Sequence, residues 1–138
     1  MILADNFFVD TYMPTGILRQ LDPEETAAYA RPFSTPGEDR RPTLTFPRQI
    51  PIDGHPSTVF ELVDAYGTWM AGCDIPKLFI NADPGGLLTG RPREFCRTWP
   101  HQTEVTVSGK HFVQEDSPDE IGRSLRTFVE GLPGSRGH

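Results

Sequence analysis

The chain has 138 residues and a net charge of −6, and 36% of its residues are hydrophobic. These values are typical of one globular domain with a modest core, and the negative charge argues against nucleic-acid binding, which needs a clustered basic face. No apolar run approaches the roughly 20 residues of a membrane span, and two isolated cysteines without a secretory leader predict a cytoplasmic location.

The first part of the chain is predicted to hold short helices. Ala4–Tyr12 is expected to be one of them, followed by a loop over Pro14–Gln20. A clearer helix start follows, because Asp22 can cap the helix, Pro23 suits its first turn and Glu25 can reach back to the cap. The sequence therefore predicts a helix that begins after Asp22.

Prolines dominate the stretch after that helix. Pro32 disfavours helix in the residue before it, so the capped helix is expected to end near Ala30. Prolines recur at positions 36, 42, 47, 51 and 56. Because proline lacks the backbone N–H that helices and strands use, residues 32–54 are predicted to be a long loop with at most a short helix near Thr43–Phe46.

Predicted helices and strands alternate in the second half of the chain. Helices are expected over Ser57–Ala71, over Pro92–Thr98 and after a capping box at Ser117–Glu120, and strands over Pro76–Ala82 and Thr103–Val107. Asp83–Gly86 is predicted to be a turn and Ser108–His111 a loop. This alternation predicts an α/β fold with a parallel sheet. Since two strands cannot form a sheet covered on both faces, neighbouring strands are expected outside this chain.

Four stretches of the sequence, in the same order, resemble haloalkane dehalogenases: RRPTLTFPRQIPIDG at 40–54, PKLFINADPGGL at 76–87, FCRTWP at 95–100 and KHFVQEDSPDEIG at 110–122. The resemblance covers nearly the whole chain and is nearest to the subfamily of the hexachlorocyclohexane-pathway enzyme. It implies the C-terminal half of an α/β-hydrolase fold. Residues 1–54 would then be part of the helical cap and the return loop, and residues 55–138 the C-terminal part of the core, with the last two parallel strands and their helices.

The resemblance also implies a reaction. In this family an aspartate displaces halide from an alkyl halide, and a histidine activates the water that hydrolyses the resulting ester. The expected substrate is a small halogenated aliphatic compound, the expected product is a halide ion, and neither a cofactor nor a metal is expected. His111 matches the catalytic histidine. The positions that match the halide site, the pocket mouth or the pocket lining are Phe46, Pro47, Ile50, Leu87 and Gly16.

The role of His111 also has support from its place in the chain. In α/β-hydrolases the histidine comes last, after the nucleophile and the acid, and His111 follows the last predicted strand. The loops after parallel strands are where such sheets bind ligands. A histidine with an ordinary pKa is largely neutral near pH 7 and can accept a proton from water. A loop histidine without a role is the alternative.

The rest of the family's catalytic machinery is expected upstream of this chain. That machinery comprises the nucleophilic aspartate, the asparagine that helps hold the halide and the glutamate of the triad. Asp83 lies near the place of the acid in another branch of the family and is a candidate acid. The chain is therefore expected to be partial and inactive alone. The alternatives are an inactive remnant, a half-domain that pairs with the missing N-terminal half, an epoxide hydrolase and a relative of a marine luciferase.

Overall fold

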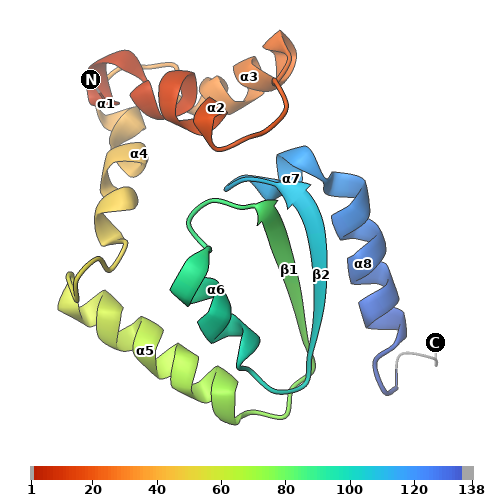
Figure 1. The fold of residues 1–138 in the computed structure, drawn as a ribbon. Helices are drawn as coiled ribbons and strands as arrows, with labels where there is room; N and C mark the ends of the chain where they lie inside the picture. Colours follow the sequence, from red (N-terminus) through yellow and green to blue (C-terminus); the bar gives the residue numbers. More distant parts are fainter. Residues whose placement is uncertain (1, 135–138) are drawn as a thin grey trace. The chain divides into compact units, whose positions relative to one another are not determined.

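A computed structural model describes residues 2–134 of the chain (Figure 1). The described residues form two compact units. Residues 2–15 and 20–68 make the first unit, and residues 16–19 and 69–134 make the second. The short segment Gly16–Arg19, which we call the strap, therefore belongs with the second half of the chain, although it lies near the N-terminus in sequence.

The first unit consists of helices and turns. Its elements are α1 (Ile2–Asp5), the π-helix η1 (Phe8–Tyr12), α2 (Met13–Thr15), α3 (Pro23–Ala30), the 3₁₀ helices η2 (Arg31–Phe33), η3 (Glu38–Arg40) and η4 (Pro47–Gln49), α4 (Arg41–Thr45) and most of α5 (Ser57–Gly72). The prediction of a loop from Pro14 onwards is wrong at its start, because the helix continues to Thr15.

The helix start predicted at Asp22 is confirmed. The Asp22 carboxylate accepts a hydrogen bond of 2.8 Å from the Glu25 N–H, and the Glu25 carboxylate accepts one of 2.9 Å from the Asp22 N–H. This reciprocal pair satisfies two backbone donors that the first turn would leave unpaired. The α-helix ends at Ala30, as expected.

The prediction of a long proline-rich loop is wrong, since three 3₁₀ helices and α4 occupy much of residues 31–49. Pro32, Pro42 and Pro47 each stand at the first or second position of one of these helices, where the missing N–H costs no hydrogen bond. The buried Arg40 side chain adds long-range support. Its guanidinium donates to the Phe33 carbonyl oxygen at 2.7 Å and also to that of Ala4.

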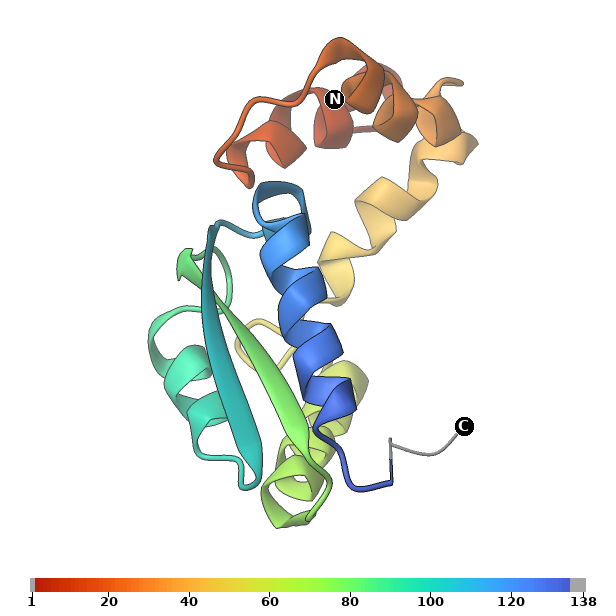
Figure 2. The ribbon, with the colours of Figure 1, turned by 90° about the vertical axis from the view of Figure 1, so that its right-hand side faces the viewer.

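The second unit contains the sheet. Strands β1 (Lys77–Pro84) and β2 (Gln102–Gly109) pair in parallel, with Lys77 opposite Gln102 and Pro84 opposite Gly109. Helix α6 (Gly90–Arg97) connects them, and α7 (Val113–Asp116) and α8 (Pro118–Glu130) follow β2. Figures 1 and 2 show α6 and α8 on opposite faces of the strand pair. This arrangement confirms the α/β alternation that the sequence predicts.

Both strands are longer than predicted. Asp83 and Pro84 were expected in a turn, and Ser108 and Gly109 in a loop, but all four pair within the sheet. Each segment is extended because the other strand supplies its hydrogen-bonding partners, and local composition does not report such a partner. The carboxyl ends of β1 and β2 therefore lie side by side, and the Gly85 N–H continues the pairing with a 2.9 Å bond to the Gly109 carbonyl oxygen.

Polar side chains take up part of the second unit's interior. The buried Lys77 ammonium donates to the carbonyl oxygens of Cys73, Ile75 and Pro100 at 2.9 to 3.0 Å. Such a charge is tolerated in the interior because each of its three donors has an acceptor. The buried Asn81 likewise bonds across the sheet, to the Thr106 hydroxyl at 3.0 Å.

The start of α8 differs from the prediction. Ser117 stands at the cap position, but its hydroxyl makes no capping bond and instead donates to the Ser108 carbonyl oxygen at 2.7 Å. The predicted capping box is therefore wrong. The buried Ser117 side chain fastens the junction of α7 and α8 to the end of β2, which is the region around His111.

Candidate functional site

His111 lies in the turn between β2 and α7, at the carboxyl end of the sheet. We refer to residues Lys110–Phe112 as the His111 turn. The His111 imidazole is exposed and contacts the Phe112 ring edge to face, with 4.7 Å between the ring centroids and 68° between the planes. An exposed imidazole beside a sheet terminus is accessible to water and to a substrate.

Backbone contacts hold the His111 turn from two directions. The Phe112 N–H donates a 2.9 Å bond to the Gly16 carbonyl oxygen in the strap. From the β1 side, Gly86 approaches so closely that a Cβ on it would lie 2.8 Å from both Cα and Cβ of His111. Real Cβ atoms do not make such short contacts, so a larger residue at position 86 would displace the His111 backbone.

Gly16 is a second glycine that contacts this turn. A Cβ there would lie 2.8 Å from Cδ2 of Phe112 and 3.4 Å from Cβ of His111. Sequence reasoning placed Gly16 near the pocket lining, and the structure places it against the His111 turn. The absence of a Cβ at both glycines therefore allows the strap and the segment after β1 to approach the His111 turn closely.

Asp83 shares the carboxyl end of the sheet with His111. It lies opposite Ser108 in the strand register and is exposed. Within residues 2–134, no hydrogen bond or ion pair joins Asp83 to His111. An acid that orients a catalytic histidine lies within hydrogen-bond reach, about 2.6 to 3.2 Å. Leu87, the predicted lining residue after Gly86, is 59% exposed.

The other three predicted lining residues belong to the first unit. Phe46 directly follows α4, Pro47 begins η4 and Ile50 follows η4. Phe46 is 74% exposed and Ile50 is 40% exposed. Their hydrogen bonds are local, from the Gln49 N–H to the Phe46 carbonyl oxygen and from the Ile50 N–H to that of Pro47. His111 belongs to the second unit, so the predicted site residues are divided between the two units.

Asp116 is a residue at this site that sequence reasoning missed. It is the last residue of α7, and its carboxylate accepts three backbone N–H bonds, two from the strap and one from Lys110. A carboxylate at the end of a helix is locally unfavourable, because the helix dipole places negative charge there. No sequence signal pointed to Asp116, because the short helix that it ends was not predicted and its hydrogen-bonding partners lie elsewhere in the chain.

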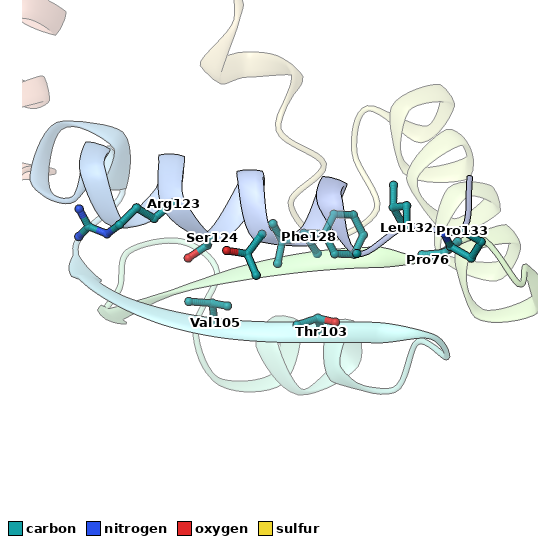
Figure 3. A pocket seen from close by; sticks show the side chains of 11 residues that line it. Pro76, Thr103, Val105, Arg123, Ser124, Phe128, Leu132 and Pro133 are labelled. Carbon is teal, nitrogen blue, oxygen red and sulfur yellow. The ribbon is translucent and has the colours of Figure 1, made fainter. Parts of the chain in front are cut away.

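A groove of about 510 Å³ in the second unit runs between α8 and the two strands (Figure 3). Its lining residues are Pro76, Leu78, Thr103, Val105, Arg123, Ser124, Thr127, Phe128, Gly131, Leu132 and Pro133. None of the predicted site residues lines it. The groove is therefore distinct from the sheet terminus that carries His111.

In the second unit, the groups with shifted pKa values lie on α6 and β2. The Arg97 guanidinium donates hydrogen bonds to Glu104 and holds the pKa of that carboxyl below its usual value. The pKa of Arg97 is raised in return, and burial raises the pKa of the Cys96 thiol.

Within residues 2–134, histidine, cysteine and acidic side chains form no group that could hold a metal ion, and no helix is both long and apolar enough for a membrane crossing.

Known proteins resemble this chain over nearly its whole length, although no model of a protein family matches it. A haloalkane dehalogenase of Sphingobium indicum is 57% identical over 132 residues, which are 96% of this chain and 45% of that protein. A coelenterazine h 2-monooxygenase of Renilla reniformis is 46% identical and matches 94% of this chain and 42% of its own length.

A solved structure gives the same relation in three dimensions. The crystal structure of the haloalkane dehalogenase DbeA from Bradyrhizobium elkani matches with a TM-score of 0.87 and 40% identity, over 95% of this chain and 45% of that one. The chain thus spans about half the length of the relatives it matches. By sequence and by fold, the chain is a homologue of the haloalkane dehalogenases, with the α/β-hydrolase fold, and it corresponds to the C-terminal part of those proteins.

Proposed function

We propose that the chain supplies the histidine base and part of the substrate pocket of a haloalkane dehalogenase-type hydrolase, with the nucleophile supplied by residues outside it. One observation carries the proposal. His111, which matches the family's catalytic histidine, lies exposed at the carboxyl end of two parallel strands. Catalytic side chains of open α/β sheets lie at that end.

The proposed reaction has two steps. In the first, a carboxylate oxygen bonds to the substrate carbon while the carbon–halogen bond breaks, which leaves an alkyl ester and a halide ion. In the second, water adds to the ester carbonyl carbon as the His111 imidazole takes one of its protons. The ester C–O bond then breaks, the alkoxide takes that proton, and the carboxyl group loses the other proton of the water to solvent, which restores the carboxylate. His111 acts only in the second step, so its loss leaves the ester intact.

Residues 1–54 are proposed to be part of the helical cap and the return loop, and residues 55–138 the C-terminal part of the hydrolase core. The proposed pocket and halide-site residues are Phe46, Pro47, Ile50, Leu87 and Gly16. They suit an apolar substrate because apolar side chains and glycine predominate among them. Asp83 is retained as a candidate acid, and an Asp83→Asn variant tests it.

The experiment compares two purified proteins. One is the 138-residue chain alone, and the other is a fusion that adds the N-terminal part of the Sphingobium indicum relative. With 1,2-dibromoethane as substrate, the chain alone is expected to release no halide and the fusion to turn over. The His111→Ala fusion is expected to release a single equivalent and then stop, because the ester still forms. Halide turnover by the His111→Ala fusion at the parent rate would contradict the proposed base.

A second candidate is a half-domain that pairs with the missing strands and has no chemistry of its own. The observation in its favour is that each strand of the described sheet is paired on one side only, which leaves backbone groups available for another strand. Size-exclusion chromatography tests it, because a compact monomer of the chain alone would contradict obligatory pairing.

The similarity to a coelenterazine monooxygenase calls for one further measurement. The fusion is mixed with coelenterazine and light emission is measured, which tests for luciferase activity in place of dehalogenation.

A further inference from the structure

The Asp116 carboxylate joins two segments that lie about a hundred residues apart in the chain. One of its oxygens, Oδ1, accepts the backbone N–H of Leu18 at 2.8 Å and that of Arg19 at 3.1 Å. The other oxygen, Oδ2, accepts the N–H of Lys110 at 3.1 Å. Lys110 directly precedes His111, so one side chain connects the strap to the first residue of the His111 turn.

Two further contacts continue the same connection. The Phe112 N–H donates to the Gly16 carbonyl oxygen at 2.9 Å, at the other end of the turn. Within the strap, the Arg19 side chain donates to the Glu115 carbonyl oxygen at 2.6 Å and pairs with the Glu115 carboxylate at 3.0 Å. The His111 turn is thus held at the residue before His111 and at the residue after it, and both bonds lead to the strap.

We infer that Asp116 is a positioning residue, which sets the backbone of the His111 turn against the strap and thereby orients the imidazole. The inferred effect on turnover rests on the proposed function. The inferred role of Asp116 in holding the backbone of the His111 turn does not depend on the proposed function, because it concerns only hydrogen bonds within the second unit. Asp116 itself touches neither substrate nor any reacting atom in this assignment.

A carboxylate is the side chain that suits this task. It offers two acceptor oxygens and no donor, so it can take N–H groups from two directions at once. Asparagine has one acceptor oxygen and an NH₂ group. An Asp116→Asn variant can therefore keep the two strap bonds on its oxygen, but its NH₂ group would then face the Lys110 N–H. The substitution removes the bond to the His111 turn and preserves the size of the side chain.

Asp119 provides the matched control. It is an exposed aspartate in the first turn of α8, three residues after Asp116. Asp119→Asn makes the same change of charge and shape without touching the His111 turn. Any effect of the lost charge alone would be shared by the two variants.

The first arm of the test uses the 138-residue chain itself and measures hydrogen exchange of individual amides by NMR. Asp116→Asn is expected to speed the exchange of the Lys110 and Phe112 amides by about tenfold or more, while the amides of the β1–β2 ladder change by less than about twofold. A merely structural role would speed all of them together. Unchanged exchange at Lys110, or an equal rise in Asp119→Asn, would overturn the inference.

The second arm uses the fusion with the Sphingobium indicum N-terminal part. Asp116→Asn is expected to lower kcat by about tenfold to a hundredfold and to lower KM with it, at a kcat/KM within about twofold of the parent, because a misplaced base slows ester hydrolysis and leaves substrate binding and ester formation intact. The first equivalent of halide should still appear at the parent rate. If kcat is unchanged while Lys110 exchange rises, Asp116 does not position the base. If the parent fusion folds but releases no halide, the proposed function fails while the first arm still decides the geometry.

Discussion

The His111 turn and the stretch Phe46–Ile50 both hold residues predicted for the site, yet they are held in opposite ways. The turn is fastened by Asp116 and by the strap, from positions about a hundred residues away. The Phe46–Ile50 stretch is held by bonds between near neighbours, and its side chains are exposed. A base needs a defined orientation, whereas an apolar lining needs only shape and hydrophobicity, and the two kinds of restraint reflect this difference.

The largest expected effect comes from filling the space beside His111. A Gly86→Ala methyl group would lie 2.8 Å from Cα of His111, so the turn must move. In the fusion we expect turnover to fall by about a hundredfold, since a shift of about 1 Å at a catalytic group has that scale. Halide release over time measures the effect.

Gly122 supplies the control for that variant. It lies inside α8, and a Cβ on it would meet nothing within 4 Å. Gly122→Ala is therefore expected to leave turnover unchanged and to stabilise the protein by about 0.5 to 1 kcal/mol, because alanine favours helix over glycine. Equal loss of turnover in both variants would mean that contact with His111 is not the cause.

A local restraint in the first unit has a smaller expected effect. Asp22→Ala removes the capping box at the start of α3. We expect a loss of about 1 kcal/mol in the free energy of unfolding, typical of a lost N-cap. Chemical denaturation followed by circular dichroism measures it, and hydrogen exchange at Lys110 should not change. A rise in that exchange would show that the two kinds of restraint are not independent.

Phe46→Ala is expected to be nearly neutral for folding. Its ring is 74% exposed, so its removal should change the free energy of unfolding by less than about 0.5 kcal/mol. In the fusion we expect KM to rise several-fold with little change in kcat, since the residue is proposed to line the pocket and not to orient His111. A fall in kcat at unchanged kcat/KM would remove the contrast between the two regions.

The smallest expected effect is on the pH dependence of stability. The folded-state pKa of Glu104 lies below its unfolded value because Arg97 donates to the carboxylate. The pair therefore stabilises the fold above the unfolded pKa, near 4.5, and this contribution is lost as pH falls through the lower folded value. Glu104→Gln should weaken the acid-induced drop in Tm. A drop equal to that of the parent would show that other groups cause the loss of stability in acid.

The sequence by itself determined the local elements and the family. The Asp22 cap, the alternation of helices and strands and the four motifs all depend on short stretches of residues, so pattern and propensity are enough to find them. The match of His111 to a family position has the same origin. The proline-rich stretch was misjudged because proline blocks the interior of a helix but suits its first turn, and composition does not distinguish the two.

Only the tertiary structure decided what holds His111 in place. The bonds from Asp116 to the strap and the approach of Gly86 join residues that are distant in sequence, and a single sequence contains no measure of such distances. The Ser117 hydroxyl illustrates the same limit, because its cap-like position predicted a local bond, whereas the buried hydroxyl donates to the Ser108 carbonyl oxygen at the end of β2. A side chain gives up its local capping bond where the fold supplies a better-placed hydrogen-bonding partner, because a buried polar group left unpaired costs more free energy than a lost cap.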